Sequence, residues 1–345
     1  MYGSTQAGRK LFTDMKNRKQ MRKIASKCVR GIMVMMMLWT CGYSYGQIYK
    51  YVGLEDGLSS RNVYAVEQSN GGFMWFLTDN GIDRYDGINI SKYTIRIAGQ
   101  KFTEYSTCRL VHDPVEDNLW MVTGLGRVVR YDIRGNRFEV MYSPQISASK
   151  ADISECAVSP IDTNGNIWIF VGDEAFCYNV RTHTGEPLRI SSSNNDSSYS
   201  AIVPRDSATL YIGTKQNVFV GHIKGTEVML EEVAALQDNE INVNTLYYND
   251  KHHTLLIGTE DAGIVAYRER TDEIIHYKDA LPDMRVTKIL PINNDEEVIF
   301  STNAACVYQM SMEDCIPAPY IQADFATDYR MNTDNVSDIC IDMDG

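Results

Sequence analysis

The chain has 345 residues, of which 44% are hydrophobic and 23% are charged. This balance excludes a disordered polymer or a collagen-like fibre and allows a sizeable buried core. The charge is divided unevenly, because nine of the 33 basic residues and only one of the 45 acidic residues lie before residue 31. We therefore expect the two ends of the chain to have different functions.

Segment 1–46 has the pattern of a secretory signal peptide. Its basic stretch ends at Arg30, the apolar run GIMVMMMLWTC follows, and Ser44 and Gly46 then form a small-x-small cleavage site. An uncleaved signal anchor is the alternative, although a membrane-spanning helix needs about 20 apolar residues and this run is shorter. Met15 and Met21 are alternative start positions. The pattern predicts export to the periplasm.

Cleavage after Gly46 leaves a mature chain, 47–345, with 24 basic and 44 acidic side chains. A surface this acidic repels phosphate backbones, so we expect no nucleic-acid partner.

Six copies of one phrase follow, and the first, NGGFMWFLTDNGIDRYDG at 70–87, is the plainest. One position recurs in every copy with spacings of 45, 48, 43, 45 and 43 residues: Trp75, Trp120, Trp168, Tyr211, Leu256 and Ile299. Each copy holds short β-rich runs separated by turns, and four strands with their turns fill about 45 residues, which is one blade of a β-propeller. We expect the recurring position to pack between neighbouring blades.

The two ends of the repeat region predict how the ring closes. Segment 335–345 (NVSDICIDMDG) matches the first strand and turn at 62–72, and residues 48–53 look like the outer strand of a blade. The sequence therefore predicts an all-β, seven-bladed propeller over 47–345, whose seventh blade is incomplete because the chain is part of a longer protein. Pairing of both ends in that blade would remove an exposed sheet edge.

The phrase GLSSRNVYAVEQSNGGFMWFLTDNGIDRYDG at 57–87 resembles the two-component regulator propeller repeat in its GLSS-x-x-V start, its G-x-x-W-x-x-T centre and its GI-x-RYDG end. The resemblance extends over 47–345 and weakens from the fourth copy onward. It implies the periplasmic sensor of a hybrid two-component system that detects oligosaccharides from glycan breakdown. Such proteins are anchored in the inner membrane, and a histidine kinase follows the sensor. It also implies a homodimer formed through parts beyond residue 345.

We expect the ligand at the face that carries the loops from each fourth strand to the next first strand and from each second strand to the third, because loop side chains are free to bind. Nine residues on those loops offer groups for sugar hydroxyls, ring stacking and a uronate carboxylate: Arg61, Asn62, Asp79, Glu104, Tyr105, Asp173, Lys215, Glu260 and Arg285.

No common catalytic motif occurs, and no catalytic residue, metal site or cofactor is predicted. Asp162, Asn164 and Asn166 look like the start of a calcium loop, but Gly165 favours a hairpin turn. The adjacent His252 and His253 would face opposite ways on a strand, which disfavours a shared metal. A secreted propeller glycoside hydrolase or polysaccharide lyase, and a scaffold for protein contacts, remain alternative functions.

Six cysteines follow the signal segment: Cys108, Cys156, Cys177, Cys306, Cys315 and Cys340. Export permits disulfides. However, Cys156 and Cys177 are predicted on a first and a third strand, with another strand between them. We expect most of these residues to be buried free thiols.

Overall fold

The computed structural model describes residues 50–97, 99–103, 108–145, 156–192, 198–236, 241–277, 285–303, 307–321 and 336–343. The predicted signal segment 1–46 lies outside these residues. Within them, every regular element is a β-strand except the short 3-10 helix Ala234–Leu236. The all-β prediction is therefore confirmed.

Most of the strands form six four-stranded antiparallel units, here called blades 1 to 6. Blade 1 contains β1 (Val63–Gln68), β2 (Met74–Thr78), β3 (Gly81–Tyr85) and β4 (Ile90–Tyr93); blade 2 contains β7 (Arg109–Asp113), β8 (Asn118–Val122), β9 (Val128–Asp132) and β10 (Arg137–Tyr142); blade 3 contains β11 (Cys156–Val158), β12 (Asn166–Val171), β13 (Glu174–Asn179) and β14 (Thr184–Ser192).

The second half of the chain repeats this plan. Blade 4 contains β15 (Tyr199–Pro204), β16 (Thr209–Thr214), β17 (Val218–Lys224) and β18 (Glu227–Glu232); blade 5 contains β19 (Val243–Asn249), β20 (Thr254–Thr259), β21 (Ile264–Arg268) and β22 (Glu273–His276); blade 6 contains β23 (Val286–Ile292), β24 (Glu297–Thr302), β25 (Val307–Ser311) and β26 (Pro317–Ile321). A two-stranded hairpin, β5 (Arg96–Ile97) with β6 (Gln100–Lys101), lies between blades 1 and 2.

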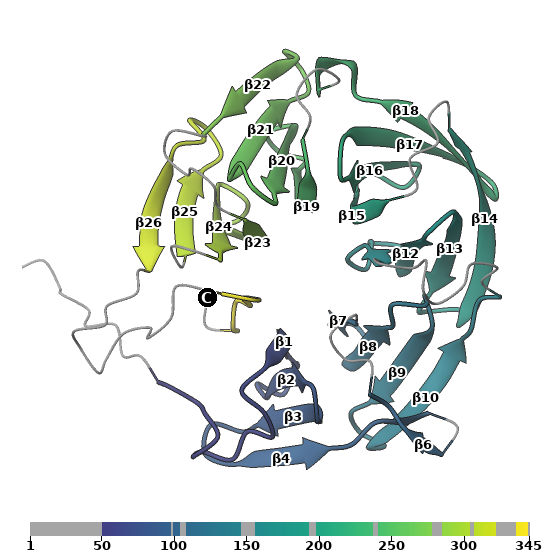
Figure 1. Cartoon of the computed structure of the whole chain (residues 1–345), viewed down its shortest axis with the longest axis vertical. Coiled ribbons are helices and arrows are strands. Elements are labelled where there is room, and N and C mark those ends of the chain that lie inside the picture. Colours follow the sequence, from purple (N-terminus) through teal and green to yellow (C-terminus); the bar gives the residue numbers. More distant parts are fainter. Residues whose placement is uncertain are drawn as a thin grey trace, which may run out of the picture. The chain divides into compact units, whose positions relative to one another are not determined.

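Within Tyr51–Gly345, the blades follow one another around a common axis with their first strands innermost (Figure 1). Strand order in space equals strand order in sequence within each blade, because every connection inside a blade is a hairpin. This radial arrangement is a β-propeller.

The recurring position lies on the second strand of all six blades, as predicted. Trp75, Trp120, Tyr211 and Leu256 are at most 1% exposed and Trp168 is 5% exposed. Three of the rings pack against a ring of the next blade. The ring centroids are 5.3 Å apart for Trp75 and Tyr131 of blade 2, 5.5 Å for Trp120 and Tyr178 of blade 3, and 5.4 Å for Tyr211 and Tyr248 of blade 5. Ile299 of blade 6 is only partly buried. The inter-blade role is therefore confirmed for the five buried residues at this position.

The opening phrase folds over the end of blade 1. The Ser59 amide donates to the buried Asp83 carboxylate at 2.6 Å, its hydroxyl lies 2.9 Å from Thr78 Oγ1, and Asn80 Nδ2 donates to its carbonyl. Gly81 adopts a φ of 141°, and a Cβ there would fall on the carbonyl oxygen of Tyr93. The GLSS, W-x-x-T and GI segments of the phrase are therefore parts of one contact.

An unpredicted seam joins blades 3 and 4 into one eight-stranded sheet. The first half of β14 pairs with β13 in the usual antiparallel way, whereas Arg189 to Ser192 pair in parallel with Glu227 to Leu230 of β18. The Arg189 amide donates to the Thr226 carbonyl at 2.8 Å. The four-strand period of the sequence does not encode this seam, because the extra length of β14 falls between repeats.

Replacing Arg189 with proline is expected to lower the free energy of unfolding by about 1–3 kcal/mol, because proline removes the amide donor at the start of the parallel pairing. Arg189→Ala keeps that amide and should change the stability by less than about 0.5 kcal/mol. Urea unfolding followed by circular dichroism measures both variants. Equal losses in the two variants would mean that the side chain, and not the seam, supplies the stability.

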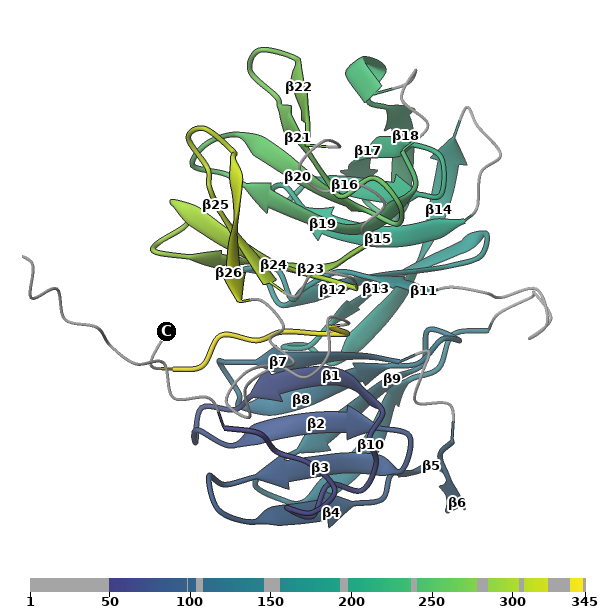
Figure 2. The same cartoon turned by 60° about the vertical axis from the view of Figure 1, so that its left-hand side comes forward.

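Residues 336–343 occupy the place of a further inner strand, between β23 and β1 (Figures 1 and 2). In three successive cases, the second residue of an inner segment donates a side-chain hydrogen bond to the carbonyl of the first residue in the next: Ser200 to Val243 (2.5 Å), Asn244 to Val286 (2.6 Å) and Thr287 to Val336 (2.8 Å). Val336 thus has the position of Val243 and Val286. The predicted match of this segment to a first strand is correct in position, although no strand is assigned to it and the count of seven blades is not confirmed.

The predicted outer strand at 48–53 is wrong in its described part. Residues 50–53 form no strand, and a turn closed by the bond from the Gly53 amide to Asp56 Oδ2 follows them. An outer strand needs a third strand beside it to receive its hydrogen bonds. The described residues hold no such third strand in the seventh position. Residues 48 and 49 lie outside the described part of the chain.

Candidate functional site

Where the structure describes them, the loops chosen from the sequence lie at one edge of the propeller. In an antiparallel blade, the start of the first strand and the end of the second strand are at the same edge. Arg61, Asn62 and Arg285 immediately precede β1 and β23, and Asp79 and Glu260 immediately follow β2 and β20. We call this edge the upper face.

On blade 1 the structure brings two predicted site residues together. Asn62 Nδ2 donates to Asp79 Oδ2 at 3.1 Å, and both side chains belong to exposed residues. Hydrogen bonds from the Ser60 hydroxyl and then from Asn62 lower the pKa of Asp79. Asp79 is therefore a carboxylate at neutral pH and an acceptor for hydroxyl groups.

A second pair links blades 5 and 6. Arg285 Nε lies 2.9 Å from Glu260 Oε2, and its Nη2 donates to Asn244 Oδ1 at 3.1 Å. The Arg285 amide also donates to Asn303 Oδ1 at 3.0 Å. Asn244 and Asn303 were not among the predicted site residues. Their signal in the sequence is weak, since single asparagines in loops are usually turn residues.

The remaining predicted site residues are not gathered at either pair. Asp173 and Lys215 are exposed in the second-to-third turns of blades 3 and 4. Blade 2 lies between blades 1 and 3 in the ring (Figure 1), so it separates Asp173 from the pair on blade 1. Glu104 and Tyr105 lie outside the described residues.

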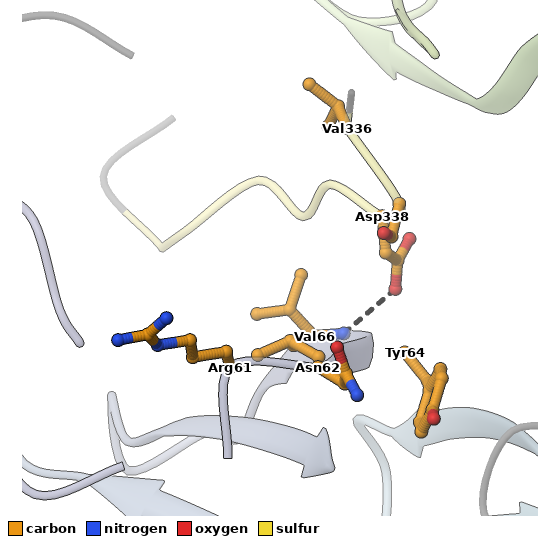
Figure 3. A pocket seen from close by; sticks show the side chains of 8 residues that line it. Arg61, Asn62, Tyr64, Val66, Val336 and Asp338 are labelled. Carbon is orange, nitrogen blue, oxygen red and sulfur yellow. Dashed lines mark hydrogen bonds between the residues drawn. The ribbon is translucent and has the colours of Figure 1, made fainter. Parts of the chain in front are cut away.

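A cavity of about 340 Å³ opens between the start of β1 and the segment 336–343 (Figure 3). Its lining includes two predicted site residues, Arg61 and Asn62; the other six lining residues are Val63, Tyr64, Val66, Val336, Ser337 and Asp338. The Val66 amide donates to Asp338 Oδ2 at 2.8 Å and so links the two sides of the lining. Parts of the chain 272 residues apart thus form a hollow that includes residues of the upper face.

A charged cluster adjoins the cavity and joins three parts of the ring. Lys288 Nζ of β23 lies 2.8 Å from Asp338 Oδ1 and 3.8 Å from Glu67 Oε1 of β1. Burial raises the pKa of Glu67 to about 7, with a smaller opposing effect of Lys288 and a further rise from Asp338. Burial would lower the pKa of Lys288, but the two carboxylates raise it. Sequence reasoning missed this cluster, and its only signal was a charged residue on each predicted inner strand.

The two sequence motifs that resemble metal sites lie in turns. Asp162 Oδ1 accepts from the amides of Asn164 and Asn166, and Gly165 has a φ of 84°. The two adjacent histidines contact different carboxylates: His252 lies 3.1 Å from Glu296 and His253 lies 3.9 Å from Glu269. Over the described stretches of the chain, no three His, Cys, Asp or Glu side chains are grouped closely enough to hold a metal ion.

The five described cysteines are free thiols. Cys108, Cys156 and Cys315 are buried, whereas Cys177 and Cys340 are partly buried. Cys156 and Cys177 lie on the first and third strands of blade 3, as predicted. Cys306 lies outside the described residues.

Within the part of the chain that the structure describes, no helix is long and apolar enough to cross a membrane.

Sequence comparisons and fold comparisons give different results. No protein-family model matches this chain, and no curated protein matches it. Its fold resembles the extracellular domain of BT3049 from B. thetaiotaomicron, described as a hybrid two-component system, with a TM-score of 0.66 and 17% identity. That alignment covers 86% of this chain and 39% of that chain.

Two further structures have related folds. The extracellular domain of BT4673 from B. thetaiotaomicron, also described as a hybrid two-component system, gives a TM-score of 0.62 at 16% identity and covers 86% of this chain and 38% of that chain. The β-propeller domain of Myceliophteria thermophila Cps50 (Swd1) gives a TM-score of 0.52 at 14% identity, and the alignment covers 76% of this chain and 86% of that chain. This chain therefore spans less than half of the extracellular domains that it matches. The first two structures are of the class that the repeat phrase indicated, which confirms the expected likeness in fold.

Proposed function

We propose that this chain is the extracytoplasmic sensor propeller of a hybrid two-component signalling protein and that it detects oligosaccharides from glycan breakdown. The observation that carries the proposal is the likeness in fold to extracellular domains of such systems. The two-component repeat phrase at 57–87, whose parts contact one another in blade 1, supports it independently. The segment itself performs no catalysis, and a histidine kinase in the same protein reads the signal.

In this proposal residues 336–343 are the inner strand of a seventh blade. The hydrogen bond from Thr287 to Val336, which repeats the bonds made by Ser200 and Asn244, supports that position. Residues 1–46 direct export to the periplasm, and the parent protein is held in the inner membrane.

The propeller acts as a rigid body in signalling. Five of the six repeat positions are packed against the next blade, so the ring bends little, and a ligand can act only by favouring one arrangement of whole domains over another. We propose that parts beyond this segment form a homodimer and that occupancy changes the spacing of the two membrane helices.

The experiment is an oligosaccharide-binding screen by isothermal titration calorimetry with the whole chain. The triple variant Arg61→Ala, Tyr105→Ala and Arg285→Ala should abolish binding, because it removes two guanidinium groups from the upper face and the aromatic ring of a third site residue that the sequence predicts. Arg134→Ala with Arg270→Ala is the matched control, since both residues are exposed in third-to-fourth turns at the opposite edge. Binding that survives the triple variant, or that the control variant abolishes, would contradict this choice of face.

A further inference from the structure

The cavity between β1 and the segment 336–343 has polar groups that are already committed to protein partners. The Asp338 carboxylate accepts from the amides of Val66 and Ile339 and pairs with Lys288 at 2.8 Å. Asn62 Nδ2 donates to Asp79. The negative charge in the lining is therefore neutralised within the protein, and it does not repel an incoming anion strongly.

Arg61 is the one lining cation, and it is in a different situation. It is exposed, and over the stretches that the structure describes it has no ion pair with a carboxylate. Figure 3 shows its guanidinium well apart from Asp338, on the other side of the labelled group. Arg285, by contrast, is held by Glu260 at 2.9 Å. Among the described residues, the cavity thus carries a guanidinium group with no carboxylate partner, and this group presents several donors in a planar fork.

The rest of the lining suits a sugar ring. Tyr64 and Ser337 bring hydroxyl groups, and Val66 and Val336 bring apolar surface. A cavity of about 340 Å³ lies at the lower end of the range for small-molecule sites, which fits one or two sugar residues. Apolar surface with a few polar groups around a cationic donor is the pattern of a site for a hydroxylated anion.

We infer that this cavity binds an acidic saccharide and that the Arg61 guanidinium donates hydrogen bonds to its anionic group. The inference rests on the proposed function and narrows the ligand class from oligosaccharides in general to those with a carboxylate or sulfate. A charge-assisted contact of this kind should favour the acidic sugar over its neutral counterpart by about 10- to 100-fold in Kd.

The test is a calorimetric comparison of paired probes on the whole chain. Tetrasaccharides of galacturonate, mannuronate and glucuronate are compared with their methyl esters, and sulfated galactose oligosaccharides with their desulfated forms, which separates the two sources of charge. Arg61→Ala should reduce the affinity for the acidic probe to that of its neutral partner, and Arg61→Lys should retain part of the preference. Arg137→Ala is the control, because Arg137 lies on the outer strand β10 and its side chain is 62% exposed.

The outcomes separate the two proposals. Binding of neutral oligosaccharides without preference for the acidic ones would overturn the acidic-ligand inference and leave the sensor proposal standing. An acid preference that Arg61→Ala does not change would overturn the role of Arg61 and of this cavity. No binding of any probe, acidic or neutral, would count against both.

Discussion

Replacing Trp120 with alanine is expected to lower the free energy of unfolding by about 3–5 kcal/mol. Trp120 is fully buried, and its ring packs against Tyr178 of the next blade at a centroid distance of 5.5 Å. Its removal leaves a cavity between blades 2 and 3 that rigid sheets on both sides cannot collapse to fill. Urea unfolding followed by far-UV circular dichroism measures the loss without depending on tryptophan fluorescence.

Ile299→Ala is the matched control at the equivalent position of blade 6. Ile299 is only partly buried, so we expect a loss of about 1–2 kcal/mol, less than for a fully buried side chain. Comparable losses at Trp120 and Ile299 would contradict the argument that the inter-blade contact, and not the strand position itself, carries the stability.

Replacing Glu67 with glutamine is expected to stabilise the protein by about 2–3 kcal/mol at pH 8 and to change it little at pH 4.5. Burial raises the pKa of Glu67 from 4.5 to about 7. The folded protein therefore holds this proton more tightly than the unfolded chain does. The resulting stability is fully present below about pH 4.5 and is lost as the pH rises through about 7. Glutamine imitates the protonated carboxyl and removes this dependence.

Two measurements check the effect of Glu67→Gln. Urea unfolding between pH 4.5 and 8 gives the stability difference, and hydrogen exchange at the Val66 amide reports on docking of the segment 336–343, since that amide donates to Asp338. Glu186→Gln on the exposed side of β14 should change neither. A wild-type protein whose stability does not fall between pH 4.5 and 7 would contradict an elevated Glu67 pKa.

The sequence by itself determined the propeller and the second-strand position of each blade centre. Strand alternation and turn chemistry are local, and a radial fold uses one local pattern again in each blade, so six copies of the phrase predict six similar units. The same reasoning placed Asp162–Asn166 in a hairpin turn and the seven described site residues at the ends of particular strands. It also matched residues 336–343 with a first strand.

Only the tertiary structure decided which side chains meet. The pairs Arg285 with Glu260 and Lys288 with Glu67, together with the cavity beside Arg61, join different repeats, and they depend on how those repeats are placed beside one another. The parallel seam between β14 and β18 and the absence of an outer strand at 50–53 have the same origin. A hairpin repeat specifies its own hydrogen bonds, but contacts between repeats depend on the twist and position of the neighbouring blade, which no single repeat encodes.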